Sequence, residues 1–272
     1  MNAAGGVDIQ MVSRIGKAVI EYLEWGKGVG ALLSGIVYWI VFGPFKGKFP
    51  RRRYIFQQMV FAGLRSVLLV FFVDFFTGIV LAIQTAYQLE KMGAVIYVAS
   101  LVAVSMCREL SPVLTGLVVA GRAGSAIAAE LGTMKVTEQV EALDTMSINP
   151  VRFLCVSRFL ALLVMVPCLV ILGNLSGILG GFIVGTGSLH INPDLYMQTT
   201  FKHMEIKDIY TGLIKAVVFG MIIALIACFE GLNTKGGAEG VGRATTRSVV
   251  ISFILIILAD CVITAFFYFS KI

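Results

Sequence analysis

Two adjacent charged residues, Arg108 and Glu109, lie about midway along an apolar run over residues 94–121. A charged side chain at the centre of a bilayer costs on the order of 3 kcal/mol, so both groups need compensation. One interpretation is a structural ion pair facing the interior of a helix bundle. The other is a polar lining of a substrate cavity, where Pro112 would free a backbone carbonyl and permit a bend.

Three further charged residues fall inside apolar runs. Lys215 lies about one and a half turns from the expected outer end of its run, where it could extend outward or meet a lipid phosphate. Asp74 and Asp260 are intramembrane acids, which we interpret first as structural partners.

A mixed polar and apolar helix face is expected in the first long run. Leu81, Gln84 and Gln88 share this face because their spacing is i, i+3 and i+7. Such a surface suits an amphiphile better than a wall that faces lipid tails.

The sequence lacks the residue patterns expected for ATP binding, metal binding or catalysis. The chain has no GxxxxGK[ST] loop, so any ATP and Mg²⁺ would be bound by another chain. The two histidines have no carboxylate or cysteine nearby at metal-ligand spacing, and the five cysteines show no CxxC spacing. No nucleophile with a base is visible, so we predict no cofactor, no metal and no catalysis in this chain.

The elements that position these residues are membrane helices. Of 272 residues, 58% are hydrophobic and 14% charged, and the mean hydropathy is +0.90, which is outside the range of soluble domains. Five apolar runs approach or exceed the about 20 residues needed to cross a bilayer. They cover residues 66–86, 94–121, 159–185, 209–229 and 248–269.

We therefore predict an all-α integral membrane protein with an N-terminal interfacial amphipathic helix, about five transmembrane helices and a short cytoplasmic helix. The first 60 residues form the interfacial elbow, and residues 61–272 form the transmembrane domain. Within the elbow, Ile9, Val12, Ile15, Val19 and Leu23 recur at helical spacing. The uncharged run over residues 29–45 could span the membrane or lie at its surface.

The positive charges indicate the orientation. Lys and Arg cluster before the first run, after the second and after the fourth, which places these segments in the cytoplasm. The N-terminus is then cytoplasmic and the C-terminus outside; if residues 29–45 crossed, only the N-terminus would move. The net charge of +6 is explained by topology and anionic lipid, with no need for nucleic acid.

Glycines at positions 173, 177, 181 and 185 give three overlapping GxxxG steps on the third run. This pattern lets a neighbouring helix come close. Tight packing is the first interpretation, and a gate or a subunit interface are the alternatives.

The segment Gly132–Met146 is predicted to be a short cytoplasmic helix in the region of about residues 122–152. Glu138 and Glu141 fall in its first turns, where acids favour a helix N-terminus, and Asn149-Pro150 ends it. The apolar positions at helical spacing are Val136, Val140 and Leu143. A solvated linker would need no such stripe.

The segment RELSPVLTGLVVAGRAGSAIAAELGTMKVTEQVEALDTMSINPVRF, with SRFLALLVMVPCL and GVGRATTRSVV, resembles the MlaE/YrbE-type permeases of ABC transporters that move lipids with MCE-domain proteins. The resemblance covers nearly the whole chain and is weakest over the first 50 residues. Ser111 departs from the family, in which a small Gly is common at that position.

The resemblance implies a non-catalytic permease subunit in a bacterial inner (plasma) membrane. Its partners would be a second copy of the chain, a cytoplasmic ATPase that binds ATP and Mg²⁺, an outer MCE-domain protein, and phospholipid as cargo. The expected substrate-binding residues are Arg108, Glu109, Leu81, Gln84, Gln88 and Lys215. The expected coupling helix, which would dock on the ATPase, includes Gly132, Thr133, Met134, Val136, Glu138, Gln139, Val140 and Leu143.

Two rival functions remain at this point. The first is a stand-alone proton-coupled secondary transporter of an amphiphilic substrate. Its relay residues would be Asp74, Glu109, Lys215 and Asp260. The second is a membrane-embedded lipid enzyme, for which no catalytic residue set is visible.

Overall fold

The computed structural model describes residues 4–43 and 52–269. Over these ranges the chain is helical and contains no β-strand, which confirms the predicted all-α membrane class. Six helices are long and apolar enough to cross a membrane. The chain divides into two compact units, Met1–Phe49 and Pro50–Ile272.

The first unit contains one continuous helix, α1 (Ala4–Phe42). Its segment Leu23–Phe42 has the length and hydropathy of a membrane span. The amphipathic face predicted from Ile9 to Val19 falls where the side chains are not described. The structure thus joins the expected elbow and the ambiguous run into a single helix, because nothing between them breaks the helical pattern.

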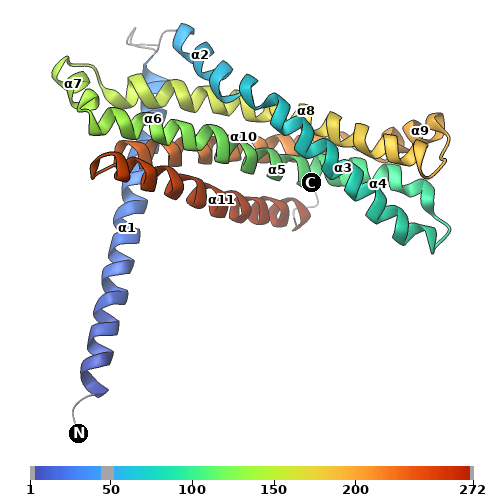
Figure 1. Ribbon diagram of the computed structural model, residues 1–272, viewed down its shortest axis with the longest axis horizontal. Coiled ribbons are helices and arrows are strands. Elements are labelled where there is room, and N and C mark those ends of the chain that lie inside the picture. Colours follow the sequence, from blue (N-terminus) through green and yellow to red (C-terminus); the bar gives the residue numbers. More distant parts are fainter. Residues whose placement is uncertain (1–3, 44–51, 270–272) are drawn as a thin grey trace. The chain divides into compact units, whose positions relative to one another are not determined.

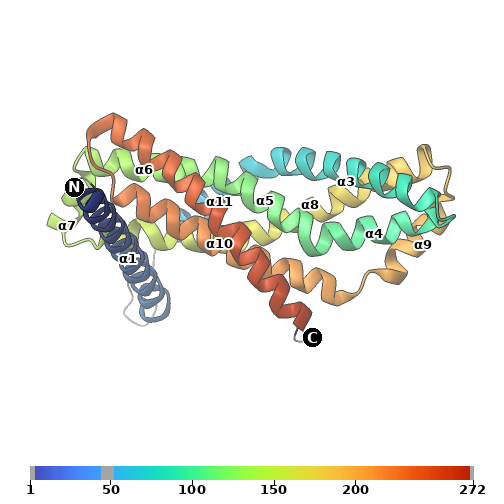
Figure 2. The same cartoon turned by 90° about the horizontal axis from the view of Figure 1, so that it is seen from below.

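The second unit holds the remaining helices (Figures 1 and 2). Along the chain they are α2 (Arg52–Ala62), η1 (Leu64–Ser66), α3 (Val67–Glu90), η2 (Val95–Tyr97), α4 (Val98–Ser105), η3 (Met106–Leu110), α5 (Ser111–Val119), η4 (Ala120–Gly124), α6 (Ser125–Val136), α7 (Gln139–Thr145), η5 (Val151–Cys155), α8 (Val156–Gly187), α9 (Pro193–His203), α10 (Ile206–Leu232) and α11 (Gly237–Phe269).

The boundary between the units lies after Phe49, eleven residues before the predicted boundary after residue 60. Helix α2 packs against α8, so it is grouped with the bundle and not with the N-terminal elbow. Arg122 on η4 ties the end of α2 into the bundle, because its Nη1 donates to Ser66 Oγ at 2.7 Å and to the Phe61 carbonyl at 3.1 Å.

Helices α3 and α8 pack closely through glycine. A Cβ atom added to Gly78 would lie 2.0 Å from the Gly177 carbonyl oxygen, and one added to Gly180 would lie 2.3 Å from the Phe75 carbonyl oxygen. Backbone atoms therefore face each other across this contact. The close packing predicted from the GxxxG pattern explains why position 177 is a glycine. Gly185, in the same pattern, leaves room for the ring of Tyr196 on α9.

The second span of this unit, Val95–Val136, is interrupted by two π-helical turns, η3 and η4. A π-turn adds a residue to one turn of helix, so it changes the direction of the side chains that follow. The turn η3 contains Arg108 and Glu109, and Pro112 follows it at the start of α5. Figure 1 shows α5, α8 and α10 running side by side along this span.

The predicted cytoplasmic helix over Gly132–Met146 is wrong as a single element. Its first part is the last turn of α6, and α7 begins only at Gln139. Glu138 between them has a φ of +60°, in the left-handed region that breaks a helix. Asn149 does not simply end α7: its side chain accepts a hydrogen bond from the Arg152 N–H at 3.1 Å and so caps the next helix.

The two polar ends of the bundle are separated. Helix α7 lies at one end and α9 at the other in both views (Figures 1 and 2). At the α9 end, Asn192 caps the helix by accepting from the Asp194 N–H at 2.9 Å. Tyr196 on α9 is buried, and this burial raises the pKa of its phenol to about 12.

Candidate functional site

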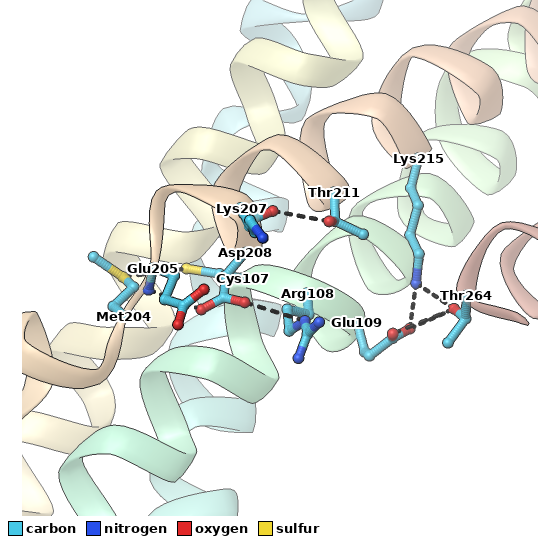
Figure 3. Close-up of polar contacts among 10 residues, drawn as sticks. All are labelled: Cys107, Arg108, Glu109, Met204, Glu205, Lys207, Asp208, Thr211, Lys215 and Thr264. Atoms are coloured by element: carbon cyan, nitrogen blue, oxygen red, sulfur yellow. Dashed lines mark hydrogen bonds and ion pairs between the residues drawn. The ribbon is translucent and has the colours of Figure 1, made fainter. Parts of the chain in front are cut away.

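A buried ionic cluster joins η3, α10 and α11. The Lys215 side chain is fully buried and its ammonium group donates to the Glu109 carboxylate. The same ammonium lies 2.8 Å from Asp260 Oδ1 and donates to Thr264 Oγ1 at 2.7 Å. Figure 3 shows Lys215, Glu109 and Thr264 pointing toward one another. Lys215 therefore does not extend outward, and its charge is matched inside the bundle.

Arg108 makes a separate ion pair with the start of α10. Its Nε lies 3.2 Å from Asp208 Oδ1, as Figure 3 shows. The other oxygen of Asp208 accepts from the Glu205 N–H at 3.0 Å, which forms a capping box and fixes the carboxylate. Arg108 and Glu109 thus do not pair with each other, because each finds its own partner on α10.

A cleft of about 290 Å³ opens beside these charges, at the small end of the range for ligand pockets. The residues lining it are Val104, Ser105, Arg108, Glu109, Thr211, Thr264, Phe267 and Tyr268. Aromatic rings stand beside a guanidinium and a carboxylate whose side chains are 49% and 40% exposed. This arrangement can bind an amphiphilic group that carries charge, and it contains no nucleophile activated by a base.

The structure brings together only part of the predicted substrate set. Arg108 and Glu109 line the cleft, and Lys215 lies behind Glu109. Leu81 packs against a buried cluster that includes Met106, while Gln84 and Gln88 are exposed on α3. No described contact joins these three α3 residues to the charged pair.

Sequence reasoning missed Thr264 and Asp208 as parts of this site. Thr264 has a usable signal, because it follows Asp260 by four residues and so shares its helix face. Asp208 has a weaker one, a position three residues after Glu205 at a helix start, which is the spacing of a capping box.

The predicted coupling residues divide into a buried and an exposed set. Gly132 and Val140 are buried, and a Cβ atom at Gly132 would lie 2.8 Å from Thr234 Oγ1. Met134 and Leu143 are half-buried. The exposed residues are Thr133, Val136, Glu138 and Gln139.

An ion pair spans the bend between α6 and α7. The Lys135 ammonium donates to the Glu141 carboxylate and lowers the pKa of that carboxyl below its usual value. Together with the buried Gly132 and Val140, this contact holds α7 at a defined angle to α6. The exposed residues form a small surface at the α7 end of the bundle.

Comparison with known proteins gives the family. Residues 55–266 match the family described as Permease MlaE. A probable ABC transporter permease protein of Rickettsia typhi is 41% identical over 257 residues, which is 94% of this chain and 97% of the relative.

Two relatives have more specific names. The intermembrane phospholipid transport system permease protein MlaE of Haemophilus influenzae is 34% identical over 264 residues, covering 96% of this chain and 98% of the relative. The chloroplastic protein TRIGALACTOSYLDIACYLGLYCEROL 1 of Arabidopsis thaliana is 35% identical over 248 residues, covering 91% of this chain and 69% of the relative. With its multi-pass helical bundle and a family match over most of its length, the chain belongs to the MlaE permease family.

Proposed function

We propose that this chain is the permease subunit of an ATP-driven transporter that moves phospholipids between membranes. The observation that carries the proposal is the cleft beside Arg108 and Glu109, because it combines charged and aromatic lining inside a membrane bundle. The Haemophilus influenzae relative is named as a phospholipid transport permease. The chain has no ATP-binding loop, so a separate ATPase would supply the energy.

The cargo needs a sheltered route. Exposing about 30 methylene groups of a diacyl lipid to water would cost roughly 24 kcal/mol, at about 0.8 kcal/mol each. In the proposed mechanism the headgroup occupies the cleft at Arg108 and Glu109, and the acyl chains lie on apolar helix surfaces. A second copy of the chain would enclose the pocket, with Gln84 and Gln88 of the exposed α3 face among its lining. An MCE-domain protein outside would pass lipid to or from it.

Coupling would run through α7 and α6. The exposed surface of Thr133, Val136, Glu138 and Gln139 is suited to docking on an ATPase. When ATP closes the ATPase dimer, the α7 segments would move together. The movement would pass from α6 back along the same membrane span, through α5, to η3. There it would change the shape of the cleft.

The test of this coupling uses Glu138→Lys in the assembled complex with its ATPase. Glu138 is exposed, so a charge reversal changes the docking surface without emptying the core. We expect lipid-stimulated ATP hydrolysis to fall by at least 10-fold. Glu90→Lys, an exposed acid at the far end of α3, should leave the activity unchanged. Unaltered stimulation in Glu138→Lys would remove α7 as the coupling element.

A second candidate function, proton-coupled transport of an amphiphile, is favoured by one observation. Glu109, Lys215 and Asp260, three of the four residues of the expected relay, lie in contact. Asp74, the fourth residue, is not part of this cluster and accepts a hydrogen bond from Thr115. Transport by proteoliposomes that stops when a protonophore collapses the gradient, without any ATPase present, would favour this candidate. Transport that requires ATP and the ATPase would exclude it.

A further inference from the structure

Asp74 on α3 is a fully buried carboxyl group without a cationic partner in the described part of the chain. Its exposed fraction is 0%, and none of the ion pairs formed by the described residues includes it. A lone ionised carboxylate is strongly unfavourable in the apolar interior of a membrane bundle. The group must therefore be neutralised by a positive charge that no Lys or Arg side chain of the described residues supplies.

Oxygen atoms from two neighbouring helices, α5 and α8, lie around this carboxyl. Thr115 Oγ1 donates to Asp74 Oδ2 at 3.3 Å. Ser111 Oγ lies beside the same carboxylate oxygen, since a Cβ atom added at Gly173 would lie 2.4 Å from Ser111 Oγ and 2.5 Å from Asp74 Oδ2. Ser111 Oγ also lies 3.4 Å from the carbonyl oxygen of Val170 on α8. The second oxygen, Oδ1, is buried and has no hydrogen-bond partner among the described residues. One acceptor of the cluster therefore remains unused.

Glycine on α8 leaves room for the cluster. A Cβ atom at Gly173 would lie 2.5 Å from Asp74 Oδ2 and 2.4 Å from Ser111 Oγ, so no side chain fits between α8 and these oxygens. The next residue, Asn174, is also buried, and its Oδ1 has no partner within the described ranges. Carboxylate, hydroxyl and carbonyl oxygens are the groups that hold Na⁺ and protons in membrane bundles.

The titratable groups on the neighbouring elements are already accounted for. They are Arg65 on η1, Tyr97 on η2, Cys107, Arg108 and Glu109 on η3, and Arg158 and Cys168 on α8; α4 and α5 carry none. The Arg65 guanidinium lies over the ring of Phe61, 5.7 Å from its centroid. Arg108 and Glu109 pair with α10. Arg158 pairs with Glu130 at 2.9 Å, and Cys168 is exposed. None of these groups supplies the positive charge that Asp74 needs.

We propose that Asp74, Ser111, Thr115 and the Val170 carbonyl form a binding site for one monovalent cation, a proton or Na⁺. The shared chemistry is the neutralisation of one buried carboxylate at the junction of α3, α5 and α8. Loss of the ion leaves an unpaired charge at a tightly packed glycine contact, which favours separation of the three helices. The site is independent of whether ATP drives transport.

The experiment measures thermal unfolding of the purified permease complex in nanodiscs between pH 5 and pH 9. One series contains choline chloride, and a second replaces choline by Na⁺ or K⁺ at equal ionic strength. A folded state that holds a proton which the unfolded chain releases loses stability as pH rises, by up to tenfold in the folded-to-unfolded ratio per pH unit. We expect this loss in the natural chain and not in Asp74→Asn, which needs no cation.

The Na⁺ series distinguishes the two candidate ions, Na⁺ and a proton. If Na⁺ is the ion, it restores the melting temperature of the natural chain at high pH in a saturable way, and K⁺ and choline do not. If a proton is the ion, only pH has an effect. Asp194→Asn, an exposed acid on α9, is the matched control and should behave like the natural chain.

A second variant covers the case in which Asp74→Asn does not fold. Thr115→Val keeps the shape of the side chain but removes one oxygen of the site. We expect it to shift the pH or Na⁺ dependence by at least several-fold in ion concentration. An identical response to pH and to Na⁺ in the natural chain and in the variants that fold would overturn the proposal.

Discussion

Lys215 explains how this bundle tolerates several charges at membrane depth. Its ammonium group contacts Glu109 on η3, and Asp260 and Thr264 on α11. One buried cation therefore links three helices and forms ion pairs with two acids. The cluster fixes Glu109 at the edge of the cleft, where part of its carboxylate remains exposed.

Replacing Lys215 by Met is expected to destabilise the permease by about 2 kcal/mol, because it leaves two carboxylates without their cation. We place the value below that for a fully buried pair, since the Glu109 side chain is 40% exposed. Thermal unfolding of the complex in nanodiscs measures it.

The double variant Lys215→Met with Asp260→Asn removes one of the orphaned acids and should recover part of the loss. If the double variant is no more stable than Lys215→Met alone, then the Lys215–Asp260 contact is not an energetically important part of the cluster.

At the scale of the elements, close helix contact and local breaks in the helices determine where side chains point. The glycines of α3 and α8 bring two backbones together. The turn η3 divides the second span of the bundle, and Glu138 separates α6 from α7. These three features position the cleft at membrane depth and the exposed α7 surface at one end of the bundle.

Gly78→Ala tests the α3–α8 contact. The added Cβ would lie 2.0 Å from the Gly177 carbonyl oxygen, so the helices must move apart. We expect a loss of stability of about 1–3 kcal/mol, as for other overpacked contacts. Gly187→Ala, near the end of α8, has nothing within 4 Å of the new atom and should change stability little. Equal melting temperatures for the two variants would contradict a close α3–α8 contact.

At the scale of the whole molecule, six candidate spans and the distribution of charge predict a topology. The segment after α10 carries Lys235, Arg243 and Arg247, which favours the cytoplasm. On this prediction, helix α11 would cross toward the outside. The helix α1 is long enough for a sixth crossing, and such a crossing changes only the side on which the N-terminus lies.

Cysteine labelling checks this topology in intact cells. Gly242→Cys and Phe269→Cys introduce thiols at exposed positions near the two ends of α11. We expect a membrane-impermeant maleimide to label Phe269→Cys directly and Gly242→Cys only after permeabilisation. The natural chain, with its five cysteines, measures the background. The reverse labelling pattern would invert the orientation of the whole bundle.

Much of this protein follows from the sequence by itself. Hydropathy determined the five spans of the bundle, because a membrane helix needs an unbroken apolar stretch that is readable in one dimension. Charge at membrane depth marked Arg108, Glu109, Lys215, Asp74 and Asp260 as residues needing partners. The glycine spacing on α8 indicated a close helix contact.

Only the tertiary structure decided which partners these residues take. Arg108 and Glu109 are neighbours in sequence but pair with Asp208 and Lys215, because adjacent residues of a helix point in different directions and meet different positions on α10. The sequence pattern also did not reveal the break at Glu138. A single left-handed residue leaves the spacing of apolar residues on either side almost unchanged. Pairing across helices depends on distances between segments about 100 residues apart, and no local pattern contains them.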